Sequence, residues 1–340
     1  MNVELCKDSD RWDSLVTEMP EACNYHRWGW KRAIEDTYGH EGFYLMALDH
    51  ASIEGILPLF EMKSRVFGHF LVSMPFFSYG GVVSKTAEAR RHLLENAVEF
   101  AKEHKVSHIE LRQSTPAEIG WQDSAAKVTM VFRLPATEEA LWKELSSGMR
   151  NKIRYAEKNG LTAEWGGLEA INTFYSIFSM NMRNLGTPVY PQRWFENLCR
   201  CFPAETRILT IRDGNQAIAS GLMTSFRDGL ELPWSATLPE SRKKYSAVYL
   251  YWSLLRWALN NGFRQVDFGR STRGSGTYEF KRHWNCEEKP LHWYYWLAPG
   301  VPLPELRPDS PRYHWATRVW KRLPLPVANF LGPRIVRSIP

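Results

Sequence analysis

The sequence of 340 residues has few of the features that mark a secreted, membrane-spanning or metal-bound protein. It contains five cysteines, an odd number, and the one close pair, Cys199 and Cys201, has a spacing that fits no common zinc site. The amino-terminal stretch MNVELCKDSD is charged from residue 4 onward and lacks the apolar core of a signal peptide. Even the apolar stretch FLVSMPFF (70–77) is far too short to span a bilayer. We therefore predict a cytoplasmic protein with reduced thiols and no structural metal.

Motifs of covalent catalysis are absent as well. No Gly-x-Ser-x-Gly occurs, no cysteine stands in a telling context, and the ten histidines form no metal-binding pattern. If the protein is an enzyme, direct transfer between two bound substrates fits this sequence better than a covalent intermediate. Catalysis would then depend on orientation and on stabilising a developing oxyanion.

Aromatic residues, in contrast, are abundant, with 15 Trp, 17 Phe and 14 Tyr. Such residues build large cores and flat stacking surfaces. The formal net charge is +6, a mild bias that suits an anionic partner such as a phosphate, a nucleotide-sugar, tRNA or a membrane face. This charge alone is too small to indicate a nucleic-acid-binding protein.

One order of elements occurs twice along the chain. In the second half, alternation predicts strands at 206–213, 216–226 and 230–237, then a helix at 245–262 with Asn261-Gly262 as its C-cap and a strand at 263–269. The first half repeats this order with strands at 42–49 and 52–62, a helix at 86–105 and a strand at 106–112. We infer two related α/β modules in tandem, each an antiparallel meander followed by a helical crossover to a parallel strand. An accidental similarity of elements is the alternative.

The predicted domain boundaries follow from this repeat. The first module is assigned to residues 1–136 and the second to 161–300. Between them, 137–160 is predicted to form linker helices, the first capped by Thr137 and the next by Ser146 or Ser147. Residues 301–340 are predicted to be a proline-rich linker and a basic, aromatic tail.

Two basic segments are candidates for phosphate binding. Arg150, Arg154 and Lys158 are spaced to share one helix face, and guanidinium groups match phosphate oxygens; the alternative is a solvated charged face. Arg242 lies in PESRKKYSA (239–247), between a strand and a helix. Acyl-CoA enzymes of this strand–helix arrangement carry a glycine-rich pyrophosphate loop there. Because the glycines are absent here, a different donor stays open.

RNLGTPVYP (183–191) is a Gly/Pro segment that contains Arg183 and Tyr190. It could line a cleft and bind substrate, although its composition alone favours a plain turn.

The segment GRSTRGSGTYEFKRHWNC (269–286) is rich in glycine at its start and contains a lysine among aromatic residues near its end. Lys281 stands between Phe280 and Trp284, where lost hydration would strengthen its field on an oxyanion or a phosphate. The alternative is a surface lysine whose stem packs on Trp284. Asp267 and Glu279 are nearby acids, and either could serve as a general base or cap a loop.

Two of these segments also carry a family resemblance. RNLGTPVYPQRWF (183–195) and VDFGRSTRGSGTYEFKRHW (266–284) resemble motifs of the Fem-type aminoacyltransferases. The sequence is most similar to the FemAB-like subgroup associated with PEP-CTERM/exosortase systems and exopolysaccharide loci. The resemblance covers about residues 10–298 and includes HRWGWKRAIEDTYGH (26–40), FFSYGG (76–81) and IELR (109–112).

The resemblance implies an α/β (α+β) fold of two tandem GNAT-related domains with a cleft between them. The best-known members of the family add amino acids from aminoacyl-tRNA to peptidoglycan precursors. Lys281 matches the lysine near the transferring carbonyl, and Arg150 and Arg154 fall where the phosphates of a nucleotide-linked precursor would be gripped. Tyr278, Phe280 and Trp284 would bind substrate beside it.

Two departures from the family pattern are visible. Asn285 stands where the family leads us to expect glycine, so the turn there is expected to be altered. A long coiled-coil arm is absent, which leaves the use of tRNA open.

We predict an acyltransferase or aminoacyltransferase that acts on a cell-envelope or exopolysaccharide precursor. Lys281 would stabilise the oxyanion, and the acceptor would lose its proton to Asp267, Glu279 or the substrate itself. Acyl-CoA or aminoacyl-tRNA would be the donor, without a tightly bound cofactor. The alternative is a non-catalytic protein that binds a nucleotide-sugar or polysaccharide.

The tail segment RYHWATRVWKRL (312–323) has Trp315, Val319 and Leu323 on one helical stripe, with arginines and a lysine on the other side. A helix of this kind could lie on the inner face of an anionic membrane or dock on the folded body.

Overall fold

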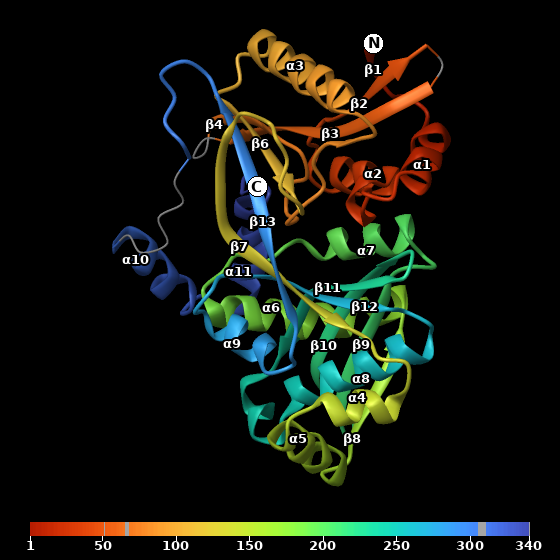
Figure 1. Ribbon diagram of the computed structural model, residues 1–340. Coiled ribbons are helices and arrows are strands. Elements are labelled where there is room, and N and C mark those ends of the chain that lie inside the picture. Colours follow the sequence, from red (N-terminus) through yellow and green to blue (C-terminus); the bar gives the residue numbers. More distant parts are fainter. Residues whose placement is uncertain (51, 65–67, 305–310, 340) are drawn as a thin grey trace. The chain divides into compact units, whose positions relative to one another are not determined.

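The computed structural model describes residues 1–50, 52–64, 68–304 and 311–339. The chain divides into two compact units, which Figure 1 shows in the colours of the sequence. The first unit consists of Met1–Lys127, Pro290–Leu306 and Arg337–Pro340, and the second of Val128–Lys289 and Arg307–Val336. None of the helices within the described residues is long and apolar enough to cross a membrane.

The first unit is a mixed sheet with helices packed on it. Its strands are β1 (Asn2–Leu5), β2 (Gly42–Asp49), β3 (Ser52–Ser64), β4 (Gly68–Val72), β5 (Val83–Ser84), β6 (His108–Gln113) and β13 (Glu287–Leu297). Its helices are α1 (Ser9–Glu18), α2 (Trp28–Tyr38) and α3 (Ala87–Glu103). The strand order is β1-β2-β3-β4-β6-β13, and β5 pairs with β3.

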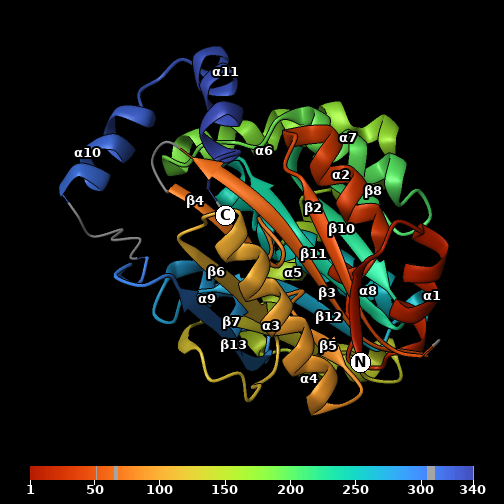
Figure 2. The same ribbon diagram turned by 90° about the horizontal axis from the view of Figure 1, so that it is seen from above.

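Helix α3 forms where the sequence predicts a helix, for reasons visible in its residues. Thr86 is the N-cap, and its side chain accepts a hydrogen bond from the backbone N–H of Ala89. Ala89, Leu93, Ala97 and Ala101 recur every fourth residue and are fully buried. This stripe packs on side chains of β2, β3 and β6. Figure 2 shows α3 lying over the strands of this sheet.

The second unit contains a stretch of mixed sheet and most of the described helices. Its strands are β7 (Gln122–Arg133), β8 (Leu161–Gly166), β9 (Arg207–Asp213), β10 (Gln216–Phe226), β11 (Gly229–Thr237) and β12 (Gln265–Ser271), in the order β7-β12-β11-β10-β9-β8. Its helices are α4 (Glu138–Glu144), α5 (Ser147–Lys158), α6 (Ile171–Leu185), α7 (Gln192–Cys201), α8 (Ser246–Asn260), α9 (Gly276–Arg282), α10 (Pro311–Trp320) and α11 (Leu325–Val336).

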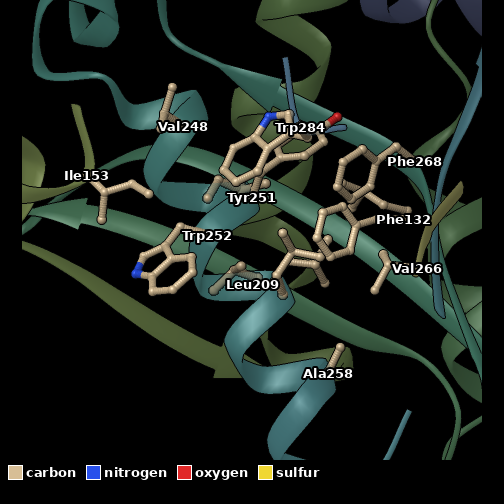
Figure 3. Close-up of a cluster of buried hydrophobic side chains, with 14 of the residues drawn as sticks. Phe132, Ile153, Leu209, Val248, Tyr251, Trp252, Ala258, Val266, Phe268 and Trp284 are labelled. Carbon is tan, nitrogen blue, oxygen red and sulfur yellow. The ribbon is translucent and has the colours of Figure 1, made fainter. Parts of the chain in front are cut away.

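Helix α8 is the central helix of this unit and is apolar over most of its circumference. Tyr251, Trp252 and Leu255 belong to a core cluster that also contains Phe268 of β12 (Figure 3). The helix ends at Asn260, and Gly262 just beyond it has a φ of +80°, a left-handed conformation that glycine adopts without a Cβ clash. Burial on several sides explains why α8 lacks the polar face of an ordinary surface helix.

The helices between the modules begin at the predicted caps. The side chain of Thr137 accepts a hydrogen bond from the N–H of Ala140, and that of Ser146 from the N–H of Met149, each at 3.2 Å. Leu141, Met149 and Ile153 then enter the core cluster of the second unit. Helices α4 and α5 are therefore part of that unit's core.

The predicted repeat is confirmed by strand pairing. In the first unit β2, β3 and β4 form an antiparallel meander, and the crossover through α3 places β6 parallel to β4. In the second unit β9, β10 and β11 form the meander, and α8 leads to β12, which is parallel to β11. The same order of elements thus builds the same topology twice.

The compact units divide the chain at other positions than the predicted domains. Strand β7 follows β6 in the chain, yet its residues 128–133 pair with β12 of the second unit. Strand β13 follows α9, yet its residues 292–297 pair with β6 of the first unit. Each module thus receives its last strand from the other module's stretch of sequence. Boundaries at 136 and 160 divide the chain into consecutive stretches, so they cannot describe strands that are exchanged between the modules.

The carboxy-terminal helices α10 and α11 pack on the second unit. A Cβ on Gly186 would clash with Cγ2 of Thr317, and one on Gly332 would lie 2.8 Å from the backbone nitrogen of Val189. These approaches are close because glycine has no side chain at either point. The Gly-Thr-Pro-Val segment after α6 therefore packs against the tail helices.

Candidate functional site

The site begins where β12 separates from its neighbours. Strand β12 pairs with β11 from Gln265 to Asp267, although β11 continues from Glu231 to Thr237. On its other side, the pairing of β12 with β7 is irregular between Asp267 and Arg270. The backbone of residues 268 and 269 therefore lies at a break in both ladders.

Gly269 makes this break sterically feasible. Its φ is +79°, a region that residues with a Cβ rarely adopt. Oδ1 of Asp267 accepts a hydrogen bond from the N–H of Gly269 at 2.7 Å and from Oγ1 of Thr129 at 2.5 Å. Asp267 is 9% exposed, so its carboxylate holds the irregular segment from within the unit.

Lys281 lies against this segment. It is 7% exposed, and its Nζ donates to the carbonyl oxygen of Gly269 at 2.8 Å and to that of Arg270 at 3.2 Å. An ammonium group has three donors, and among the described residues the third has no acceptor. Burial lowers the pKa of Lys281 to about 8, and the negative charge of Asp267 opposes this shift.

Two further ionisable groups belong to this region, Cys286 beside Lys281 and Tyr251 beside Cys286. Burial raises the pKa of the Cys286 thiol to about 12, although the positive charge of Lys281 acts against it. Burial also raises the pKa of Tyr251 to about 12, while its hydrogen bond to Ser235 of β11 acts in the opposite direction. Tyr251 and Cys286 are therefore neutral near pH 7, and Lys281 is mainly cationic.

The aromatic residues around Lys281 serve mainly as core. Trp284 is fully buried, and its ring lies 5.8 Å from that of Tyr251 and 6.3 Å from that of Phe268. Phe280 packs edge-on against Tyr251 at 5.0 Å. Figure 3 shows Trp284, Tyr251 and Phe268 gathered in this way. The aromatics thus anchor the helix that carries Lys281.

Much of the glycine-rich stretch is helical. Ser275 caps α9, its side chain accepting a hydrogen bond from the N–H of Tyr278 at 3.2 Å, and Lys281 follows near the end of this short helix. The hydroxyl of Tyr278 donates to Oε2 of Glu288 at 2.7 Å. Glu279 points elsewhere, to Arg282, at 3.0 Å. Of the two predicted acids, the structure brings only Asp267 to Lys281.

Asn285 adopts the turn that the family resemblance assigns to glycine. Its φ is +59°, and asparagine is among the few residues with a side chain that tolerate this region. Its side-chain amide donates to the carbonyl oxygen of Glu144 at 2.9 Å. Asn285 thus forms a turn in a region that glycine also adopts, and it contacts the end of α4.

The basic segments meet through Tyr245, which precedes α8 in a left-handed conformation. Nζ of Lys152 lies 5.9 Å from the centroid of the Tyr245 ring, and the ring of Tyr155 packs against it at 5.5 Å. Tyr245 directly follows the short 3₁₀ helix Pro239–Lys244, in which Arg242 and Lys243 are exposed. The face of α5 that approaches this basic turn therefore carries Lys152.

The residues predicted to form a basic stripe on α5, Arg150, Arg154 and Lys158, have other surroundings than Lys152. Arg154 is exposed, with its guanidinium 5.2 Å from the centroid of the Trp142 ring, and Lys158 is exposed near the end of the helix. Arg150 is half-buried in the first turn. Among the described residues, none of Arg150, Lys152, Arg242 and Lys243 has an acidic partner within salt-bridge distance.

Arg183 and Tyr190 lie away from these groups. Arg183 is on α6, and its Nη1 donates to the carbonyl oxygen of Lys321 at 3.5 Å. Tyr190 is half-buried, and its ring lies 6.2 Å from those of Phe195 and Trp234. In this structure the segment 183–191 supports the tail and packs beside β11.

Sequence reasoning missed three residues of the site, namely Gly269, Tyr251 and Cys286. Gly269 carried a signal, because a glycine inside a strand often marks a bulge. Tyr251 lies in an apolar predicted helix, where nothing distinguishes it from a core residue, and Cys286 belongs to no sequence motif. Within the described residues, no group of three or more His, Cys, Asp or Glu side chains is placed to hold a metal ion.

Comparison with known proteins relates part of the chain to a domain family. Residues 145–282, which include Lys281, match the acetyltransferase (GNAT) domain family. No curated protein sequence matches the chain at a significant level.

Solved structures match over nearly the whole chain. FemX is 14% identical with a TM-score of 0.71, covering 86% of this chain and 97% of FemX. The C-terminal domain of a putative lysylphosphatidylglycerol synthetase from Agrobacterium fabrum is 11% identical with a TM-score of 0.58, covering 85% of this chain and 92% of that domain. A tandem GNAT protein from the clavulanic acid biosynthesis pathway is 11% identical with a TM-score of 0.52, covering 89% of this chain and all of that one, 100%. The fold is thus mixed α/β with two tandem GNAT domains, as predicted.

Proposed function

We propose that the protein is an acyltransferase or aminoacyltransferase and that the transferring carbonyl lies beside Lys281. The observation that supports this proposal is the ammonium group of Lys281. Two backbone carbonyl oxygens hold it in place, and its third donor has no acceptor among the residues that the structure describes. A fixed donor in a buried setting can stabilise a developing oxyanion more strongly than a solvated one.

The break between β11 and β12 supports the position of the donor. Beyond Glu231, β11 continues to Thr237 without pairing with β12. Strand edges that lack a neighbour offer backbone N–H and C=O groups to an extended ligand. The donor's arm would lie along this part of β11, which places its carbonyl near Gly269 and Lys281.

The basic turn at Pro239–Lys244 supports phosphate binding by the same donor. Arg242 and Lys243 are exposed there, and Lys152 of α5 lies near Tyr245 at the same turn. Acyl-CoA carries phosphates, as does aminoacyl-tRNA, so either donor fits this charge.

In the proposed reaction an amine or hydroxyl of the acceptor attacks the donor's carbonyl carbon and forms a tetrahedral oxyanion beside Lys281. Collapse of this intermediate breaks the bond to the CoA sulfur or the tRNA ribose oxygen. Asp267 accepts from Thr129 and Gly269, and Glu279 is paired with Arg282. We therefore assign the acceptor's proton to the departing thiolate or alkoxide.

A cell-envelope or exopolysaccharide precursor is proposed as the acceptor. The Fem-type motifs at 183–195 and 266–284 support this assignment, as does the similarity in fold to FemX and to a putative lysylphosphatidylglycerol synthetase. The PEP-CTERM/exosortase subgroup is proposed on the motifs alone. The reaction would take place on the cytoplasmic side of the envelope.

The test is incubation of the purified protein with labelled acetyl-CoA or charged tRNA and a nucleotide-sugar or lipid-linked acceptor. Product that forms with one donor alone identifies that donor. Saturable binding of a nucleotide-sugar without product from either donor contradicts the proposal and supports a non-catalytic binding protein.

A further inference from the structure

The tail presents large apolar side chains to solvent. We call these residues the tail surface: Trp315 at 65% exposure and Val319 at 40% on α10, with Val327 at 40%, Phe330 at 61%, Leu331 at 37% and Ile335 at 40% on α11. The α10 pair is spaced i and i+4, and the α11 residues fall at i, i+3, i+4 and i+8, so each set shares one helix face.

Helix α11 buries its smaller apolar residues and exposes its larger ones, which is the reverse of an ordinary amphipathic helix. The face that is buried on the second unit carries Ala328, Gly332 and Val336, which are small or medium in size. The exposed face carries the larger Phe330 and Leu331. A helix that only docked on the body would bury its large apolar residues and expose polar ones. The exposed face therefore indicates a second apolar environment.

Charge identifies that environment. The last acidic residue of the chain is Asp309, and the tail beyond it carries only basic charges. Arg318 and Arg322, one turn apart, and Lys321 are exposed, and none has an acidic partner among the described residues. The guanidinium of Arg334 lies 3.8 Å from the centroid of the Phe330 ring. Apolar and cationic groups are thus interleaved.

We propose that the tail surface binds the headgroup region of an anionic phospholipid bilayer. Trp and Phe side chains enter the interface, and the basic groups pair with lipid phosphates. A second copy of the chain is a weaker candidate, because a symmetric contact would bring the same positive charges together. This inference goes beyond acyl transfer and does not depend on it.

The test is flotation of the full-length protein with phosphatidylcholine vesicles that contain phosphatidylglycerol, and with pure phosphatidylcholine vesicles. The apolar variant is W315S/F330S, and its control is Leu168→Ser, which replaces an exposed apolar residue of the second unit outside the tail. The charge variant is R318E/R322E, and its matched control is K7E/K102E, two exposed lysines of the first unit.

We expect binding to the anionic vesicles alone, weakening as salt is raised, and a loss of at least about tenfold in affinity in both tail variants. Both controls should bind like the wild type, and all variants should melt at the same temperature because the substituted side chains are exposed. Absence of binding to anionic vesicles, or equal binding by the tail variants, overturns the proposal. A dimer in sedimentation that the W315S/F330S variant alone disrupts also overturns it. Acyl transfer to a soluble acceptor should persist in the tail variants, which separates this test from that of the proposed function.

Discussion

Nζ of Lys281 lies 2.8 Å from the carbonyl oxygen of Gly269, the one glycine of β12. This contact joins a short helix to the point where β12 leaves β11 and where its pairing with β7 is irregular. It also directs a buried cation at the segment where a donor's carbonyl is proposed to lie. The predictions below follow from this contact and its surroundings.

The stability of the protein should report the lowered pKa of Lys281. The folded-state pKa is about 8 and the unfolded one is 10.5, so between these values the unfolded chain binds more protons. The free energy of unfolding contributed by Lys281 should therefore rise with pH through this window, by up to about 3 kcal/mol. Urea denaturation of wild type and Lys281→Met at several pH values measures it as the difference between them. A difference that does not change with pH would contradict the buried ammonium.

Gly269→Ala should reduce turnover more than its effect on stability explains. The left-handed φ of +79° costs a residue with a Cβ about 1–2 kcal/mol, and the new Cβ would lie 3.9 Å from Nζ of Lys281. Gly262→Ala is the matched control, since its φ is +80° and nothing lies within 4 Å of its Cβ. Both variants should lose similar stability in urea denaturation. Equal turnover in the two would show that Gly269 has only a backbone role.

Asn285→Gly should fold as well as the wild type within about 1 kcal/mol, because glycine relieves the φ of +59° while the hydrogen bond to Glu144 is lost. Asn285→Ala loses the same hydrogen bond and pays the left-handed cost, so it should be less stable than Asn285→Gly by about 1–2 kcal/mol. Thermal or urea denaturation measures both. The reverse order would show that the turn does not depend on this conformation.

The double variant Arg242→Ala/Lys243→Ala should raise KM for the donor by about threefold to tenfold and leave kcat nearly unchanged, because exposed charges give modest binding energy. Lys143→Ala/Arg264→Ala removes two positive charges elsewhere in the second unit and serves as control. Steady-state kinetics with the donor varied decides the matter. A fall in kcat at constant KM would place the basic turn in the chemistry instead of in donor binding.

Much of the fold follows from local patterns in the sequence. Alternation predicted β10 at 216–226 to the residue, and Thr137 and Ser146 cap helices as expected, because capping is decided by neighbouring residues. Strands β7 and β13 depend on partners far along the chain, and local periodicity carries no information about such an exchange. The domain boundaries were displaced for this reason.

The site was predictable in part. Lys281 and Asp267 lie together, but Glu279 turns to Arg282 because it lies on another side of α9. Spacing on α5 predicts that Arg150, Arg154 and Lys158 share a face, but it carries no information about which residue approaches Tyr245, and that residue is Lys152. Helix α9 is not apparent from the sequence, because the glycine-rich residues before it conceal the cap at Ser275.

The most direct measurement is the turnover of Lys281→Met with whichever donor yields product, compared with Arg282→Met in the same helix. Methionine keeps the length of the side chain and removes the ammonium, and Arg282 is 64% exposed and paired with Glu279. The account predicts a fall of about 100-fold or more in kcat for Lys281→Met, with a folded protein, and a change within about twofold for Arg282→Met. Unchanged turnover in a folded Lys281→Met variant would contradict it.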